Sequence, residues 1–192
     1  MGEKPKVLLI DPPWQFRVWS RDTGQGRSAE AHYPTMSLGE LKALSFSDVM
    51  APDSAMLMWA TFPTLPEALE LGKAWGYTYK TVAFTWVKTT KHGKWHMGMG
   101  YYTRANSEIC LLFTRGKPLK RKAKNVRQLL IAPVRRHSQK PDEQYERIEA
   151  LFDGPYLEAF ARQAWPGWGR WGNEVESTIE IALLPADEEK SA

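Results

Sequence analysis

The sequence is poor in the features that mark disulfide-stabilised, secreted and membrane proteins. Its 192 residues include one cysteine, Cys110, so an internal disulfide is excluded and a reducing compartment is favoured. Cys110 lies in the apolar run EICLLF, which indicates a buried structural thiol. No run reaches the roughly 18 apolar residues of a membrane span, and the start, MGEKPKVLLID, lacks the long apolar region of a signal peptide. We therefore expect no membrane partner and a cytoplasmic protein, or a nuclear protein if the source is eukaryotic.

Metal-ligand and nucleotide-binding motifs are equally scarce. Two of the four histidines, His92 and His96, have the i,i+4 spacing of metal ligands, but no cysteine or carboxylate lies close to them in the sequence. We therefore predict no metal site. The sequence also lacks a GxxxxGK[ST] loop and a GxSxG motif, which argues against NTP hydrolysis and against a serine hydrolase.

Acidic residues are absent from one long stretch and concentrated in another. Ten Lys or Arg residues and no Asp or Glu lie between Arg115 and Lys140, although the net charge of the chain is only +4. Six acids between Glu174 and Glu189 give the other end the opposite charge. This asymmetry predicts a surface that contacts polyanions, with a solvated basic loop as the alternative.

Apolar runs alternate with helix-start signals along the chain. Ser37 with Glu40, and Thr64 with Glu67, have the spacing of a capping box and predict two helix starts. The alternation favours an α/β fold, a sheet with helices on both faces. Strands are predicted at 7–10, 55–60, 80–88, 107–116, 156–162 and 178–184, and helices at 37–44, 64–77 and 140–152.

Several polar residues follow the predicted strands. In α/β sheets ligands bind beyond the carboxyl ends of the strands. Asp11, Lys88, the stretch after Arg115, and Arg162 all stand at such ends in the sequence. We therefore expect them to share one edge of the sheet with the ligand site.

The segment Asp11-Pro12-Pro13-Trp14 directly follows the first predicted strand. Asp11 and the carbonyl of Pro12, held by two prolines, offer two rigid hydrogen-bond acceptors, and the ring of Trp14 offers a stacking surface worth about 1–3 kcal/mol per base. This set fits a planar heterocycle with an exocyclic amino group, adenine or cytosine. The alternative is a rigid turn after a strand, and the four residues alone leave both interpretations open.

The surrounding segments add a resemblance to a known family. The DPPW motif is the signature of amino-group methyltransferases that use S-adenosylmethionine (SAM), and the chain resembles their MT-A family of adenine-N6 methyltransferases. The resemblance implies a Rossmann-like methyltransferase fold with a mostly parallel sheet and helices on both faces, in which the catalytic motif precedes the cofactor-binding segment. It also implies methyl transfer to N6 of adenine, with S-adenosylhomocysteine as product. The length of the chain favours one domain over residues 1–192, with a core at 5–184 and an acidic tail at 185–192. The similar segments are DPPW, YPTMS, LMWAT, WGY, WVKT, RANSEICLLFTRGKP, HSQKPDEQYERIE, LEAFAR and WGNE.

The resemblance also assigns residues to the site. It implies that Asp11, Pro12, Pro13 and Trp14 form the catalytic loop. Trp14 and Tyr33 are assigned to the substrate, and Lys88, which ends a predicted strand, is placed with them. The residues assigned to the cofactor are Asp11, Lys140, Glu158, Arg162, Asn173 and Glu174.

The chain departs from the family pattern at three of its positions. Ala161 stands where the family usually has Gly, and Trp165 and Glu174 stand where the eukaryotic catalytic subunits have Asn and Gln. A carboxylate at Glu174 still accepts hydrogen bonds from ribose hydroxyls. The Trp165 change leaves the ribose contacts open.

Nucleic acid is the expected partner, with DNA favoured over RNA because the sequence is almost wholly the catalytic domain. The loops 17–32 and 89–103 are expected to contact the grooves or to cover the pocket. The residues predicted to contact the nucleic-acid backbone are Arg115, Lys117, Lys120, Arg121, Lys122, Lys124, Arg127, Arg135 and Arg136.

Other functions remain open at this point. The alternatives are an RNA adenine methyltransferase, an enzyme for cytosine or a small amine, and a catalytically silent nucleic-acid-binding subunit. The intact Asp11-to-Trp14 motif, Lys140 and Arg162 argue against the silent subunit. The sequence also leaves open a homodimer or a partner subunit, and whether the WPGWGRWG segment is interface or core.

Overall fold

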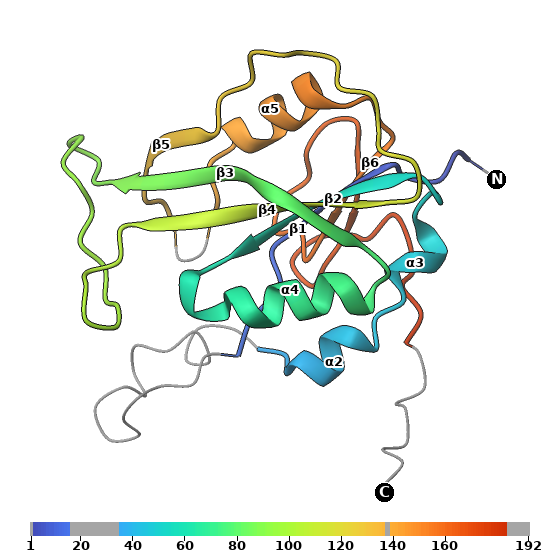
Figure 1. Cartoon of the computed structure of the whole chain (residues 1–192), viewed down its shortest axis with the longest axis horizontal. Coiled ribbons are helices and arrows are strands. Elements are labelled where there is room, and N and C mark those ends of the chain that lie inside the picture. Colours follow the sequence, from blue (N-terminus) through green and yellow to red (C-terminus); the bar gives the residue numbers. More distant parts are fainter. Residues whose placement is uncertain (1, 16–34, 137–138, 184–192) are drawn as a thin grey trace, which may run out of the picture.

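A seven-stranded mixed sheet organises the chain (Figure 1). The computed structural model describes residues 2–15, 35–136 and 139–183. The strands are β1 (Val7–Ile10), β2 (Ser54–Ala60), β3 (Thr78–Thr89), β4 (Ser107–Arg115), β5 (Leu129–Pro133), β6 (Tyr156–Ala159) and β7 (Trp168–Trp171). Their order in the sheet is β5-β3-β4-β2-β1-β6-β7, and β4 is antiparallel to both neighbours while the other four pairings are parallel.

Helices cover both faces of this sheet. They are α2 (Leu38–Lys42), α3 (Phe46–Val49), the 3-10 helix η3 (Phe62–Thr64), α4 (Leu65–Ala74) and α5 (Glu143–Leu151). Successive residues of the buried strand β1 point to opposite faces. Leu8 and Ile10 pack with residues of α2, α3 and α4, whereas Val7 and Leu9 pack with residues of α5 (Figure 1). The predicted α/β fold, with a mostly parallel sheet and helices on both faces, is confirmed.

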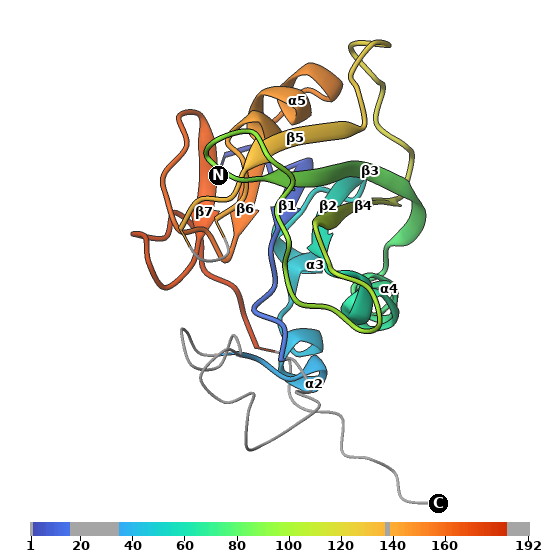
Figure 2. The same cartoon turned by 90° about the vertical axis from the view of Figure 1, so that its left-hand side faces the viewer.

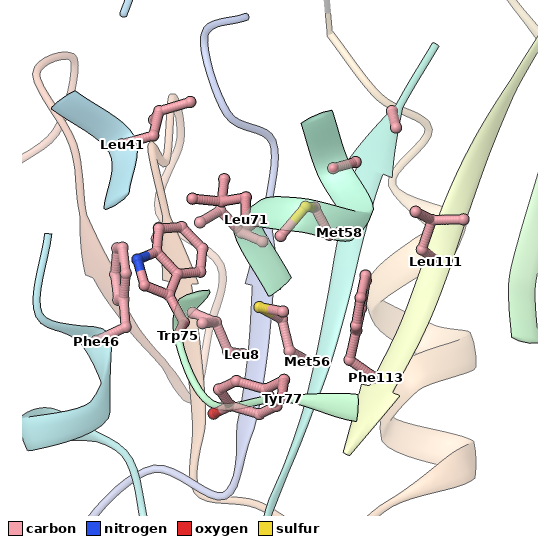
Figure 3. Close-up of a cluster of buried hydrophobic side chains, with 14 of the residues drawn as sticks. Leu8, Leu41, Phe46, Met56, Met58, Leu71, Trp75, Tyr77, Leu111 and Phe113 are labelled. Carbon is pink, nitrogen blue, oxygen red and sulfur yellow. The ribbon is translucent and has the colours of Figure 1, made fainter. Parts of the chain in front are cut away.

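The core beneath α4 holds the central strands in place (Figure 3). Leu8 of β1 and Met56 and Met58 of β2 pack in one cluster with Leu71 and Trp75 at α4. All five side chains are at most 4% exposed. Burying an apolar side chain of this size contributes about 1.5–3 kcal/mol, so this layer anchors β1 and β2, whose carboxyl ends carry the site.

One of the two predicted capping boxes is present. Ser37 caps α2, since its hydroxyl accepts from the backbone of Glu40 and the Glu40 carboxylate accepts from the backbone of Ser37. The box predicted between Thr64 and Glu67 is wrong. The Thr64 hydroxyl turns back instead, donating to the carbonyl of Thr61 and accepting from its amide across η3.

The last predicted strand, at 178–184, is also wrong for the part that the structure describes. Ile179 and Ile181 pack against the α4-side core, and Leu183 makes only an isolated β-bridge with Leu44. The carbonyl of Ala182 accepts from the amide of Ser45. The alternating apolar pattern therefore reflects packing beneath the helices, and the segment joins no strand of the sheet.

Two strands were not predicted. The edge strand β5 consists of LLIAP, a short run inside the basic segment, and Leu129 and Ile131 are 53% and 58% exposed. The other is β7, which lies within the WPGWGRWG segment. Its Trp168 is 5% exposed and packs in the core on the α5 side of the sheet. This tryptophan of the WPGWGRWG segment is therefore a core residue and not part of an interface.

The antiparallel strand β4 changes which residues share the ligand edge. Ala60, at the carboxyl end of β2, pairs with Ile109, whereas Ser54, at its start, pairs with Arg115. The prediction that the stretch after Arg115 lies at the ligand edge is therefore wrong, because the carboxyl end of β4 points to the opposite edge. In the described part of the chain, no helix is long and apolar enough to cross a bilayer.

Candidate active site

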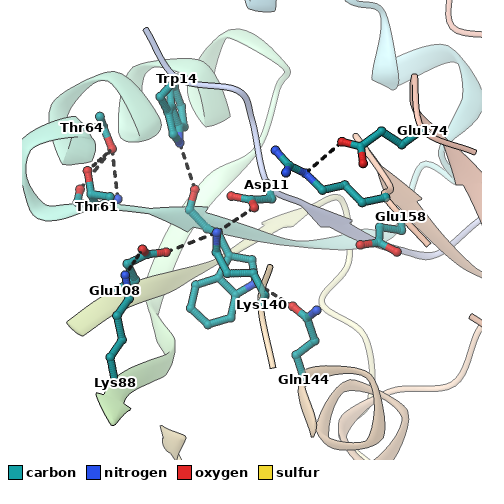
Figure 4. Close-up of polar contacts among 12 residues, drawn as sticks. Asp11, Trp14, Thr61, Thr64, Lys88, Glu108, Lys140, Gln144, Glu158 and Glu174 are labelled. Carbon is teal, nitrogen blue, oxygen red and sulfur yellow. Dashed lines mark hydrogen bonds and ion pairs between the residues drawn. The ribbon is translucent and has the colours of Figure 1, made fainter. Parts of the chain in front are cut away.

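Four ionisable side chains, two acids alternating with two lysines, meet at the carboxyl edge of the sheet (Figure 4). The ammonium of Lys140 lies 2.7 Å from Oδ2 of Asp11 and 3.2 Å from Oε2 of Glu108. The other oxygen of Glu108 pairs with Lys88. Asp11 follows β1, Lys88 is the second-last residue of β3, Glu108 is the second residue of β4, and Lys140 precedes α5. Four segments therefore supply this charged chain.

Burial and opposite charges set the protonation of the charged chain. The Lys140 side chain is 7% exposed, and two carboxylates outweigh this burial and raise its pKa. Burial opposes ionisation of Glu108, but Lys140 and Lys88 together hold its pKa below the usual range. Burial raises the pKa of Asp11, and the ammonium of Lys140 opposes that shift. Lys140 is thus held charged, and Asp11 is the harder of the two acids to ionise.

The catalytic-motif prolines form a tight turn. The carbonyl of Pro12 accepts from the amide of Trp14 at 2.8 Å, and the carbonyl of Pro13 accepts from Met36 at 2.9 Å. A carbonyl oxygen has two lone pairs, so the bond from Trp14 still leaves Pro12 one acceptor position. These two hydrogen bonds, together with the fixed φ of each proline, hold each carbonyl group in one direction.

Trp14 lies in the core rather than on an open surface. Its ring is 6% exposed, and its indole N–H donates to the carbonyl of Trp59 at 3.2 Å (Figure 4). The Trp59 ring lies beneath Lys140, whose Nζ is 5.6 Å from the ring centroid, and Trp59 donates to Gln144 at 2.7 Å. Trp14 therefore braces the loop that carries Asp11, and its role as a stacking platform stays a prediction.

A cavity of about 330 Å³ opens beside Asp11. It lies at the same edge of the sheet as the charged chain. Of the six residues assigned to the cofactor, five line it: Asp11, Lys140, Glu158, Arg162 and Glu174. The sixth, Asn173, is exposed beside Glu174 in the turn that follows β7.

Glu158 is an acid of this cavity whose pKa burial raises strongly. The hydroxyl of Tyr145 donates to both of its carboxylate oxygens, at 3.0 and 2.9 Å, and burial raises the pKa of Glu158 to about 7. Trp165, the residue that replaces the family's Asn, stacks on the Tyr145 ring with centroids 4.3 Å apart. It is not among the residues that line the cavity, so it supports the Tyr145 wall from behind.

The other wall comes from the ends of β6 and β7. Arg162 lies 3.5 Å from a carboxylate oxygen of Glu174. Phe160, which also lines the cavity, has a φ of +58°, a left-handed conformation that is unfavourable for a residue with a Cβ. Strained backbone of this kind persists where surrounding structure enforces it, here the bond from the Ala161 amide to the carbonyl of Trp171.

The predicted phosphate-contacting residues do not gather on one face. Arg115 donates to the carbonyls of Ser47, Met50 and Ala51 at the far edge, and Lys122 pairs with Asp153. Of the nine, Arg136 lines the cavity, and Arg135 pairs with Asp142 near it. The phosphate contacts stay a prediction.

Some sequence predictions concern residues that the structure does not describe. Tyr33 and the loop 17–32 lie outside the described residues. Among residues 2–15, 35–136 and 139–183, no group of three or more His, Cys, Asp or Glu is placed to hold a metal ion.

Sequence reasoning missed several residues of the site. Glu108 falls within the strand predicted at 107–116, and the apolar pattern assigns it no role in the site. An acid at the start of the run SEICLLF could nevertheless have indicated a functional residue. Gln144 and Tyr145 lie in the first turn of α5 on its buried face, where an amide and a phenol need hydrogen-bond partners that the sequence alone does not name.

Comparison with known proteins gives one consistent result. The MT-A70 family matches residues 5–174. The chain is 36% identical to the Type II methyltransferase M.MunI of Mycoplasma sp., over 93% of this chain and 82% of that protein. It is 31% identical to the N(6)-adenosine-methyltransferase MT-A70-like protein of Drosophila melanogaster and 29% identical to the N(6)-adenosine-methyltransferase catalytic subunit METTL3 of Homo sapiens, over 88% and 94% of this chain. The chain spans only 27% and 29% of those two relatives.

The family match and the site coincide. Every member of the charged chain and every residue that lines the cavity falls within residues 5–174. The chain belongs to the MT-A70 family of methyltransferases.

Proposed function

We propose that this protein transfers a methyl group from SAM to the N6 amine of adenine in nucleic acid, with DNA as the favoured polymer. The observation that carries the proposal is the position of Asp11. Its carboxylate belongs to the charged chain and also lines the cavity that holds most of the assigned cofactor residues. One acid thus stands between a cofactor-sized cavity and the edge where the amine would enter.

The residues of the cavity fit SAM chemically. A volume of about 330 Å³ is within the range of small-molecule sites. Lys140 and Arg162 would hold the carboxylate of SAM, and Glu158 and Glu174 would accept hydrogen bonds from its amino and hydroxyl groups. When bound, SAM supplies a methyl group that its sulfonium has already activated.

Asp11 would act as an acceptor that orients the amine. Its carboxylate and the Pro12 carbonyl accept hydrogen bonds from the amino group, which aims the nitrogen lone pair and stabilises the positive charge that grows there. The amine loses its proton only after it has become cationic, so Asp11 need not be a strong base. The ammonium of Lys140 at 2.7 Å favours the ionised, accepting form of Asp11.

Adenine is favoured by the names of the relatives. Two of the compared proteins are called N(6)-adenosine-methyltransferases. DNA is favoured over RNA because the higher identity, 36%, is to the Type II methyltransferase, which this chain also covers over most of its length. A duplex substrate would require the adenine to leave the base stack before it reaches Asp11.

The test is methyl transfer from labelled SAM to unmodified duplex DNA, single-stranded DNA and RNA, with the product nucleosides identified by mass spectrometry. We expect N6-methyladenine, with DNA methylated faster than RNA. Asp11→Asn keeps the size of the side chain and should lower the rate about 100- to 1,000-fold, as loss of a transition-state contact does. Asp153→Asn, in the exposed pair with Lys122, is the matched control and should keep full activity.

N4-methylcytosine as the sole product, or full activity of the Asp11→Asn protein with an unchanged melting temperature, would overturn the proposal. Methylation of RNA alone would overturn the preference for DNA.

A further inference from the structure

An arm of the chain projects beyond the sheet at the edge that carries Asp11. This arm, residues 89–106, runs from the last residue of β3 to the residue before β4. It extends past the strand ends in Figure 1 and lies in front of the sheet in Figure 2. It begins after Lys88 and ends before Glu108, two members of the charged chain, and the Lys88 amide donates to the carbonyl of Asn106 at 2.8 Å. Whatever binds the arm therefore lies next to the active site.

The arm presents a row of large apolar side chains to solvent. Trp95, Met97 and Met99 are 64%, 67% and 66% exposed, and Tyr102 is fully exposed. The residues between them, His96 and Gly98, are turned inward and less exposed. Over residues 95–99 this alternation with a period of two is that of an extended segment with one outward face, which Trp95, Met97 and Met99 share. Tyr102 adds a fully exposed ring in the bend at 101–103 that follows.

The backbone of the arm is braced, so the exposure of this row is not that of a frayed loop. The His96 amide donates to the carbonyl of Lys88 at 3.0 Å, and the Gly98 amide donates to the carbonyl of Ala105 at 2.8 Å. The Arg104 side chain also donates to the carbonyl of Gly98. A Cβ at Gly98 would lie 2.6 Å from the Ala105 oxygen, so a glycine is needed for the two halves to approach.

The charge of the arm identifies the partner. Residues 89–106 contain Lys91, Lys94 and Arg104 together with two histidines, and no Asp or Glu. Exposed aromatic rings interleaved with cations are the arrangement that binds single-stranded nucleic acid, where rings stack on bases and cations meet phosphates. A protein partner would also cover an apolar row. Binding to a protein, however, does not by itself require that the arm lack Asp and Glu, whereas binding to phosphates favours their absence.

We propose that the arm binds the nucleic-acid strand that carries the target adenine. Trp95 and Tyr102 stack on unpaired bases that flank the target, and Lys91 and Lys94 contact the phosphates. This inference rests on the proposed function for its choice of partner. It places a substrate-binding surface on residues outside the cavity and outside the charged chain.

The test is the affinity of the full-length protein for fluorescein-labelled single-stranded and duplex oligonucleotides, measured by anisotropy. The double variant Trp95→Leu/Tyr102→Leu removes both rings but keeps apolar side chains. It should weaken single-strand binding about 10- to 100-fold, as loss of base stacking does, while Trp95→Phe/Tyr102→Phe should restore most of the affinity. Lys91→Gln/Lys94→Gln should lower the salt slope of single-strand binding by about 1.4.

The matched controls lie at the opposite end of β3. Tyr79→Leu removes a 43% exposed ring that packs on Phe113, and Lys80→Gln removes an exposed cation. Both should leave affinity and salt slope unchanged. Binding of SAM, measured by calorimetry, should be the same in all of these proteins.

Three results would overturn the inference: no oligonucleotide binding by the wild-type protein, wild-type affinity in the double leucine variant, or an arm variant that changes only the sedimentation coefficient, which would assign the row to a protein partner. Loss of the proposed function has a different signature. The arm would then still bind the strand, but no N6-methyladenine would form.

Discussion

The ammonium of Lys140 lies 2.7 Å from a carboxylate oxygen of Asp11, a residue 129 positions earlier in the sequence. This pair joins the loop after β1 to the segment that starts α5. Removing two charges from water is costly, and a buried pair is retained only with good geometry and further hydrogen bonds. Here Glu108 supplies the second contact to Lys140. The same arrangement that holds the active-site edge together also keeps Asp11 beside a cation.

Replacing Lys140 by Met should destabilise the fold and abolish methyl transfer. The change leaves Asp11 without its cation and Glu108 with Lys88 alone, and breaking such a buried pair costs about 3–5 kcal/mol. Urea denaturation of the two proteins, monitored by circular dichroism, measures this free energy of unfolding.

Lys122→Met is the control for that experiment, because it breaks an exposed pair with Asp153 and should leave the urea midpoint unchanged. Adding Glu108→Gln to the Lys140→Met protein should recover part of the lost stability. Wild-type stability of Lys140→Met alone would show that the pair does not hold this edge together.

The pH dependence of methyl transfer should report the ionisation of Asp11. Burial raises the pKa of this acid, and the negative charge of Glu108 raises it further. As the pH is lowered, the rate should therefore begin to fall at a pH above about 3.9, the ordinary pKa of an aspartate. Glu108→Gln removes that nearby negative charge, so the acid limb should move to lower pH.

Single-turnover rates from pH 4 to pH 8, with saturating SAM and DNA, measure the acid limb of the wild-type protein and of the Glu108→Gln protein. An acid limb that stays in place, or moves to higher pH, in the Glu108→Gln protein would exclude Asp11 as the group that titrates. Circular dichroism at each pH separates this effect from unfolding.

The parts of this site that follow from local sequence were predicted, and the parts that depend on strand direction were not. Asp11 stands directly after an apolar run, and Lys140 and Arg162 lie in recognisable segments. Glu108 reaches the same edge only because β4 runs antiparallel to β2, which brings the start of β4 to the end of its neighbour. The same reversal takes Arg115 to the far edge. Strand direction is a property of the assembled sheet, so the charged chain was not visible in the sequence.

The missed strands have a related cause. Leu129 and Ile131 of β5 are apolar but exposed at the sheet edge, and only Leu130 between them is fully buried. The sequence of this strand therefore lacks the alternation of apolar and polar residues that predicts a strand. At 178–183 the opposite occurs. Ile179 and Ile181 alternate as in a strand, but they pack against the core without joining the sheet. Hydrophobic alternation reports burial on one side, not backbone pairing.

Glu158 should make the stability of the protein fall as the pH rises. Its pKa is raised from 4.5 to about 7, so between these values the folded state binds a proton that the unfolded state has lost. The contribution to stability is therefore fully present below pH 4.5 and is lost as the pH rises to 7. Glu158→Gln cannot ionise and should gain about 2–3 kcal/mol relative to wild type between pH 5 and pH 8.

Urea unfolding of both proteins at pH 5 and pH 8 gives this difference. Glu67→Gln, an exposed change on α4, should shift stability equally at both pH values. An equal shift for Glu158→Gln would mean that burial does not raise the pKa of this carboxyl group. Because Glu158 lines the cavity, the variant should also bind SAM more weakly.

Gly172 should be irreplaceable, because it lets the turn after β7 approach β6. A Cβ at this position would lie 2.4 Å from the oxygen and 2.7 Å from the nitrogen of Ala161, both backbone atoms that no side-chain rotation can move. Gly172→Ala should therefore displace the turn that carries Asn173 and Glu174. We expect a loss of about 1–3 kcal/mol in stability, as for other overpacked sites, together with weaker SAM binding measured by calorimetry.

Gly39→Ala is the matched control, since its Cβ would meet only the Ser37 oxygen, at 4.0 Å. That substitution lies in α2 and should instead stabilise the protein by about 0.5–1 kcal/mol, because alanine favours helix over glycine. If Gly172→Ala loses stability but keeps wild-type affinity for SAM, the turn is needed for packing alone, and Asn173 and Glu174 do not contact the cofactor. If both properties fall together while Gly39→Ala changes neither in that direction, the close approach of β7 to β6 is what positions this wall of the cavity.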